Sequence, residues 1–246
     1  GFEMYSIIAK VVGAVSKYAK EENYKVSVNS IYNEITSSTK LIYIANPNNP
    51  TGSYLTKKEI IELMLKIPKN IIVVLDGAYA EYVEKNNYDS GFSLVKKFDN
   101  IVLTRTFSKA YGLAGLRLGW CYSSKKVSNI LQKVKGPFNI NTVAQEMAIV
   151  ALSDQDHLKY IIKHNKEVKK WFEDQLIKLK IKTHLSFANF SFIELTDKKA
   201  KMYAKHLEKN GIVIRQLHSY NLSHCLRITI GTKNNMKKVI KNLNQL

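Results

Sequence analysis

Apolar and polar positions along the 246 residues alternate in a way that predicts strands and helices in turn. Short continuous apolar runs indicate buried strands, and apolar residues spaced three or four apart indicate helices. In the first part of the chain this pattern predicts strands at 14–19, 41–45, 71–75, 101–103 and 116–122, and helices at 4–12, 28–34, 56–66, 93–98 and 143–152. Such an order is typical of an α/β domain with a mostly parallel sheet flanked by helices.

The pattern changes after a long amphipathic helix predicted at 158–179. Strands predicted at 189–195, 212–215 and 225–230, and helices predicted at 198–210 and 233–246, then follow in the order βαββα. That order suits a small α+β domain. We therefore expect a large α/β domain at residues 1–150, followed at residues 151–246 by an interdomain helix and a small C-terminal domain.

Polar residues stand directly after two of the predicted strands. Asp76 ends the apolar run 71–75, and Asn49 lies between Pro47 and Pro50 in a loop that the prolines make rigid. Open α/β sheets bind ligands outside the carboxyl ends of their strands, so a ligand site is expected here. The alternatives are that Asp76 caps the following helix and that Asn49 is an ordinary turn residue.

A turn-rich segment after the fourth predicted strand combines hydroxyls, a lysine, glycines and arginines. A lysine that attacks a carbonyl must lose its proton part of the time, and a fixed cation such as Arg117 or Arg105 lowers the pKa of a neighbouring lysine. Thr106, Ser108 and Arg117 could hold a phosphate. The segment therefore indicates a site for an anionic carbonyl cofactor at Lys109, or otherwise a loop with a surface lysine.

The same segment, read as TFSKAYGLAGLRLGW, resembles the lysine-bearing motif of the fold type I pyridoxal-phosphate (PLP) aminotransferases. It is most similar to the histidinol-phosphate aminotransferase branch of that family. Stretches 46–52, 76–79 and 226–232 match further motifs in the family's order. The resemblance runs from residue 2 to the C-terminus, and it implies a PLP-transferase fold and a PLP cofactor.

The resemblance also implies a reaction, which is the transfer of an amino group from L-histidinol phosphate to 2-oxoglutarate in histidine biosynthesis. The products would be imidazole acetol phosphate and L-glutamate. By the family's pattern, Lys109 would carry the cofactor and move the substrate proton. Asp76 would pair with the pyridine nitrogen, while Asn49 and Tyr79 would contact the ring hydroxyl.

Further residues match the family's cofactor and phosphate contacts. Phe2 would stack on the cofactor ring, although a frayed terminal hydrophobe is the alternative. Thr106, Ser108 and Arg117 would bind the cofactor phosphate.

Two arginines near the C-terminus match the family's substrate contacts. Arg227 also stands out by itself, because a charge inside an apolar strand needs an anionic partner. By resemblance Arg227 and Arg215 would bind the anionic substrate, together with Asn49. The alternative for Arg215 is a surface strand residue.

Family members carry roughly 100 further residues before the position of Phe2, including a loop whose amides hold the cofactor phosphate as fixed donors. They also have an N-terminal arm and a tyrosine that reaches across a homodimer interface. Because this sequence lacks those residues, we expect reduced PLP affinity and weak or absent activity.

Composition narrows the remaining function classes. The net charge of +18 could indicate nucleic-acid binding, but the lysines are scattered along predicted helices, so no nucleic-acid partner is expected. No run approaches the roughly 20 apolar residues of a membrane helix. The two cysteines provide neither a disulfide framework nor metal-ligand spacing, which favours a cytoplasmic protein without a metal.

Two alternatives remain open at this stage. A PLP-dependent decarboxylase of a phosphorylated amino acid would use the same Lys109 and Asp76 and would release carbon dioxide. A non-catalytic aminotransferase-like ligand-binding domain of a transcription regulator would be revealed by salt-dependent DNA binding.

Overall fold

The computed structural model describes all residues from 1 to 246. Contacts between Cα atoms divide the chain into two compact units. Unit 1 comprises residues 1–49 and 53–159, and unit 2 comprises residues 50–52 and 160–246. None of the helices combines the length and the hydropathy needed to cross a lipid bilayer.

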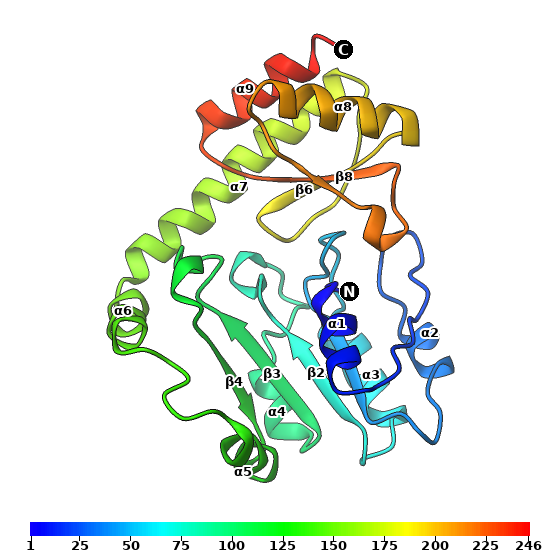
Figure 1. Cartoon of the computed structure of the whole chain (residues 1–246), viewed down its shortest axis with the longest axis vertical. Helices are drawn as coiled ribbons and strands as arrows, with labels where there is room; N and C mark the ends of the chain where they lie inside the picture. The colour runs from blue at the N-terminus through cyan, green and yellow to red at the C-terminus, as the bar shows by residue number, and fades with distance from the viewer. The chain divides into compact units, whose positions relative to one another are not determined.

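Unit 1 is built on a four-stranded sheet with the strand order β1-β2-β3-β4 (Figure 1). The strands are β1 (Leu41–Ala45), β2 (Ile72–Asp76), β3 (Ile101–Thr106) and β4 (Gly119–Ser123). The first three are parallel, and β4 runs antiparallel to β3. This confirms the predicted mostly parallel α/β sheet.

Helices cover one face of this sheet. They are α2 (Val28–Asn33), α3 (Lys57–Lys66) and α4 (Phe92–Lys97). Ile31, Leu63 and Leu94 from these helices join one buried cluster with Val73 and Leu75 of β2. A capping box begins α3, in which Thr56 and Glu59 each accept a hydrogen bond from the other's backbone amide.

The remaining helices of unit 1 contribute less to this core. They are α1 (Met4–Val11), α5 (Lys125–Val134), α6 (Thr142–Ser153) and the short 3-10 turns η1 (Ala80–Tyr82) and η2 (Ala114–Leu116). Ala144 and Ala148 of α6 pack with Phe107 and Leu118 in a second small cluster. Asn141 caps α6, and its side chain accepts a hydrogen bond from the Ala144 amide at 2.8 Å.

One predicted strand of unit 1 is wrong and one helix was not predicted. Residues 14–19 form no strand, and Val15 is 90% exposed, because no neighbouring strand pairs with this segment. α5 was not predicted, although Val127, Ile130, Leu131 and Val134 recur at helical spacing, and none of its side chains is buried.

Unit 2 holds a second four-stranded sheet, in the order β5-β6-β8-β7, with antiparallel neighbours. Its strands are β5 (Lys182–His184), β6 (Phe190–Glu194), β7 (Arg215–Gln216) and β8 (Cys225–Thr229), with η3 (His218–Tyr220) between the last two. Helices α7 (Gln155–Lys178), α8 (Asp197–Lys209) and α9 (Lys233–Leu243) supply Phe172, Leu207 and Met236 to its core. This is the expected α+β arrangement, with the short β5 as an unpredicted addition.

Candidate active site

The carboxyl ends of β1, β2 and β3 lie side by side and determine which side chains share a face. Ala45, Asp76 and Thr104 are register partners on these strands. Side chains alternate along a strand, and Val73 and Leu75 point into the core beneath the helices. Asp76 therefore projects from the opposite face, the open face, which α2, α3 and α4 do not cover and on which Tyr5 of α1 stacks against Tyr43.

The same alternation separates two neighbouring residues of β3. Thr106 follows Thr104 by two positions and shares the open face with Asp76. Arg105 projects to the helix-covered face instead. The sheet thus places the predicted cofactor contacts Asp76 and Thr106 together and puts Arg105 on the other side.

Arg105 forms a buried ion pair on that helix-covered side. Its Nη1 lies 2.8 Å from Oε1 of Glu81, and the two side chains are only 8% and 13% exposed. Burial raises the pKa of Glu81, and Arg105 offsets only part of that rise. Because Glu81 compensates the guanidinium charge, the expectation that Arg105 acts as a fixed cation on the lysine has no support in this geometry.

Gly77 lies in close contact with the Arg105 side chain. A Cβ atom at position 77 would lie 3.0 Å from Nε of Arg105. The position therefore favours glycine for reasons of space, and it lets the turn after Asp76 approach Arg105 closely.

The Asp76 carboxylate accepts hydrogen bonds from two neutral donors. The Tyr5 hydroxyl donates to Oδ2 at 2.6 Å, and the Ala78 amide donates to Oδ1 at 3.1 Å. Asp76 forms no ion pair with a lysine, an arginine or a histidine. Sequence reasoning did not single out Tyr5, although its position one helical turn after Phe2 was a usable signal.

Lys109 lies beside Tyr79. Its Nζ is 5.5 Å from the centroid of the Tyr79 ring, which is buried. The lysine-bearing loop is fixed by backbone hydrogen bonds from Phe107 to Leu118 (3.1 Å) and from Leu113 to Phe107 (2.9 Å). The structure therefore brings together the lysine predicted from the loop and the tyrosine predicted from the turn after β2.

The loop after β1 holds Asn49, which is only 5% exposed. Its first residue, Asn46, accepts a hydrogen bond from the Leu55 amide at 2.7 Å and donates to the Leu55 carbonyl at 3.2 Å. The Tyr88 hydroxyl donates to the Asn46 carbonyl at 2.8 Å. The Asn46–Pro47 peptide bond is cis. These contacts give the rigid loop that the prolines predicted.

The residues predicted to bind the cofactor phosphate are only partly brought together. Thr106 Oγ1 accepts from the Ser108 amide at 3.0 Å, so these two residues are in contact. Arg117 is exposed, and its Nη1 donates to the Ala114 carbonyl at 2.7 Å. Phe2 is 40% exposed and meets the Tyr5 ring edge-on, with 5.8 Å between centroids.

This donor set fits the chemistry of PLP. The fit rests on a carboxylate that has neutral donors but no resident cation, which suits a protonated pyridine nitrogen. The set also includes the amine of Lys109, 5.5 Å from the centroid of the Tyr79 ring, and the buried polar side chains of Asn49 and Tyr79. The hydroxyls of Thr106 and Ser108 suit a phosphate.

Unit 2 carries the two predicted substrate arginines on neighbouring strands. Arg215 and Arg227 are direct register partners, and the Arg227 guanidinium lies 5.1 Å from the centroid of the Phe190 ring. Leu226 and Ile228 point into the helical core, so Arg227 projects from the opposite face. Like charges directly opposite each other disfavour the pairing, and a bound anion would relieve this repulsion.

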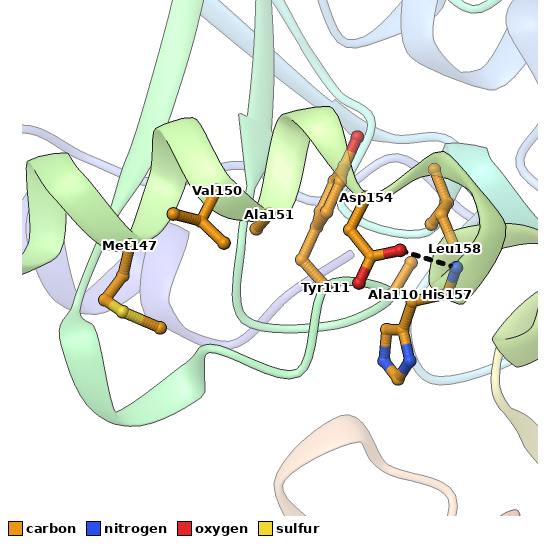
Figure 2. Close-up of a pocket in the computed structure, with 8 residues that line it drawn as sticks. All are labelled: Ala110, Tyr111, Met147, Val150, Ala151, Asp154, His157 and Leu158. Carbon is orange, nitrogen blue, oxygen red and sulfur yellow. Dashed lines mark hydrogen bonds between the residues drawn. The ribbon is translucent and has the colours of Figure 1, made fainter.

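A separate pocket of about 160 Å³ lies beside α6 and the residues that follow Lys109 (Figure 2). Its lining is largely apolar and consists of Ala110, Tyr111, Met147, Val150, Ala151, Asp154, His157 and Leu158. Asp154 accepts from the His157 amide at 3.0 Å, an N-terminal capping contact of α7. The pocket contains none of the predicted site residues and is smaller than the roughly 300 Å³ typical of ligand pockets, so it is not the candidate site.

Comparison with known proteins agrees with this arrangement. Residues 1–243 match the family described as Aminotransferase class I and II. A histidinol-phosphate aminotransferase of Pelagibacter ubique is 45% identical over 240 residues, which cover 96% of this chain and 67% of that protein. The chain thus spans about two thirds of the length of such relatives.

Solved structures show the same fold. The histidinol-phosphate aminotransferase of Sinorhizobium meliloti in complex with pyridoxal-5'-phosphate is 25% identical, with a TM-score of 0.94, and the match covers 100% of this chain and 68% of that one. The L-threonine-O-3-phosphate decarboxylase of Porphyromonas gingivalis is 23% identical, with a TM-score of 0.78, and the match covers 100% of this chain and 74% of that one. The second likeness concerns the fold alone.

Proposed function

We propose that this chain, which belongs to the class I and II aminotransferase family, transfers the amino group of L-histidinol phosphate to 2-oxoglutarate in histidine biosynthesis. The cofactor of this family is pyridoxal 5'-phosphate. The observation that carries the proposal is the open face at the strand ends, where Asp76, without a resident cation, stands beside the loops of Lys109 and Asn49. The 45% identity to a histidinol-phosphate aminotransferase supports the choice of substrate.

The roles of the residues follow from their chemistry. When bound, PLP supplies a ring that accepts the electron pair released at the substrate's α-carbon. Lys109 would hold the cofactor covalently, and its freed amine would then remove and return the α-proton. Asp76 would pair with the ring nitrogen, while Asn49 and Tyr79 would donate to the ring hydroxyl.

Binding would be shared among further residues. Thr106, Ser108 and Arg117 would bind the cofactor phosphate, and Arg117 would use N–H donors other than the one on the Ala114 carbonyl. Phe2 would stack on the ring. Arg227 and Arg215 would bind the anionic substrate, because their repulsion favours an anion between them, and Asn49 would also contact it.

We further propose a homodimer in the cytoplasm, as the family resemblance suggests. The two cysteines of the chain, Cys121 and Cys225, form no disulfide with each other, which suits a reducing compartment.

An absorbance experiment tests the function. PLP is added to the chain, then L-histidinol phosphate, then 2-oxoglutarate. We expect a visible band that shifts with the amine and returns with the oxo acid. Lys109→Ala should abolish this band, and the exposed Lys58→Ala should retain it. A band that survives Lys109→Ala would contradict the assignment.

Substrate and product measurements separate the alternatives. Arg227→Leu should raise the KM for L-histidinol phosphate by roughly 10- to 100-fold with little change in PLP affinity, because it removes charge-assisted hydrogen bonds to the substrate. Exposed Arg215→Leu should have a smaller effect of the same kind. Release of carbon dioxide in place of glutamate would indicate a decarboxylase.

A further inference from the structure

The contact between Tyr5 and Asp76 joins residues that are 71 positions apart in the sequence. The Tyr5 hydroxyl donates to Asp76 Oδ2 at 2.6 Å, while the Ala78 amide donates to Oδ1 at 3.1 Å. A carboxylate can accept about four hydrogen bonds, so both oxygens retain acceptor capacity. The two donors fix the orientation of the carboxylate and leave its negative charge uncompensated.

Ring contacts hold the Tyr5 hydroxyl in place. The Tyr5 ring stacks on Tyr43 with 4.8 Å between centroids and an interplanar angle of 20°. Tyr43 is the register partner of Val74, so it shares the open face with Asp76. Burial, and next the charge of Asp76, raise the pKa of Tyr5 above its usual value, so the hydroxyl remains a donor at working pH.

We propose that Tyr5 is a positioning residue that orients Asp76 toward the pyridine nitrogen of the cofactor and keeps their shared proton on that nitrogen. The inference rests on the proposed function. A hydrogen bond to a carboxylate stabilises its charged form. With PLP bound, the Tyr5 hydrogen bond would therefore favour the proton on the ring nitrogen, and the ring would keep the positive charge that makes it an electron acceptor.

The neutral phenol of Tyr5 suits this role better than a cationic side chain would. A lysine or arginine at the same place would form an ion pair with Asp76 and cancel the charge that the ring nitrogen needs. A neutral hydroxyl fixes the carboxylate without doing so. Arg105, the nearest arginine in the sequence to the cofactor lysine, is paired with Glu81 on the opposite face of the sheet.

Tyr5→Phe tests the role, because it keeps the stacked ring and removes only the hydroxyl. We expect about 10-fold weaker PLP binding, as for the loss of one hydrogen bond to a charged group. The midpoint of the pH titration of the bound cofactor's absorbance should move to higher pH. A ring with less positive charge lets the nitrogen that links it to Lys109 hold its proton more tightly.

Two controls separate positioning from packing. Tyr54→Phe removes a hydroxyl that donates to Asn87 at 2.7 Å on the surface of the same unit, and it should change neither the affinity nor the midpoint. In an Asp76→Asn background, Tyr5→Phe should have little further effect on either quantity. Thermal melting of each ligand-free variant verifies that it is folded.

Each outcome decides the inference. If the parent chain binds PLP, and Tyr5→Phe binds it equally with the same midpoint, the positioning role is wrong while the proposed function stands. An equal loss in the Asp76→Asn background would assign the effect to packing and also overturn the role. If the parent chain gives no cofactor band, the proposed function fails, and the inference fails with it.

Discussion

Two carboxylates of unit 1, Asp76 and Asp89, differ in how their charge is compensated. Asp89 is 8% exposed, forms an ion pair with Lys57 at 2.9 Å, and accepts from the Gly91 amide at 2.7 Å and from the Ser93 hydroxyl. Asp76, at the end of β2, has only neutral donors.

The comparison distinguishes a structural carboxylate from one that can bind a ligand. A cation and several donors that already surround a buried charge leave it little to gain from a ligand. Neutral donors stabilise and orient a charge without cancelling it, so a cation from a cofactor can still be bound. Whether a carboxylate can bind a cationic ligand therefore depends on whether a cation of the protein already pairs with it. Substitutions of single residues test this difference.

The largest effect is expected at a third carboxylate, Glu81, because it forms a buried ion pair with Arg105. Arg105→Met leaves Glu81 buried without its cation and should lower the free energy of unfolding by about 3–5 kcal/mol. Urea denaturation measures this change. The double variant Glu81→Met/Arg105→Met should recover most of the loss, and equal losses in the single and double variants would contradict the ion-pair explanation.

Asp76→Asn should show the opposite profile, a loss of turnover without a loss of stability. We expect transamination to fall on the order of 100-fold or more, as when a preorganised electrostatic group is removed from an active site. The free energy of unfolding should change by less than about 1 kcal/mol. Steady-state kinetics and denaturation measure both, with the exposed Asp99→Asn as a matched control.

Asp89→Asn should lower stability by about 1–3 kcal/mol at neutral pH, through hydrogen bonds to a charged group. Burial alone would raise the pKa of Asp89, but hydrogen bonds from Ser93, Lys57 and Gly91 outweigh it and hold the pKa below 3.8. The stabilisation is therefore present above pH 3.8 and is lost as the pH falls through the folded-state pKa.

Melting temperatures measured across acidic pH test this sign. The difference in melting temperature between the parent chain and Asp89→Asn should be largest above pH 3.8 and should decrease below it. A difference in melting temperature that increases on acidification would show that the charge of Asp89 is not what stabilises the fold.

The smallest effect is expected for Lys57→Gln. Lys57 is 49% exposed, so solvent screens its pairing with Asp89, and the loss should be below about 1 kcal/mol. The difference from the parent chain should nearly vanish in 1 M salt, where the Debye length is about 3 Å. A loss that persists in salt would indicate that Lys57 contributes by packing rather than by charge.

The sequence by itself determined the features that depend on neighbouring residues. The strand at 41–45 is found where the local pattern predicted it, and the helix predicted at 56–66 is found as α3. The positions of Asp76 and Lys109 after buried strands were also readable, because carboxyl ends of parallel strands meet at one edge. Their catalytic roles remain predictions of the proposed function.

Only the tertiary structure decided which charges face one another. Tyr5 reaches Asp76 across 71 positions, Arg105 turns away from the lysine toward Glu81, and residues 14–19 form no strand. The pairing of Arg215 with Arg227 likewise required the register of β7 on β8. Local patterns define elements and their exposed ends, whereas contacts between distant residues depend on sheet register and on which face each side chain occupies.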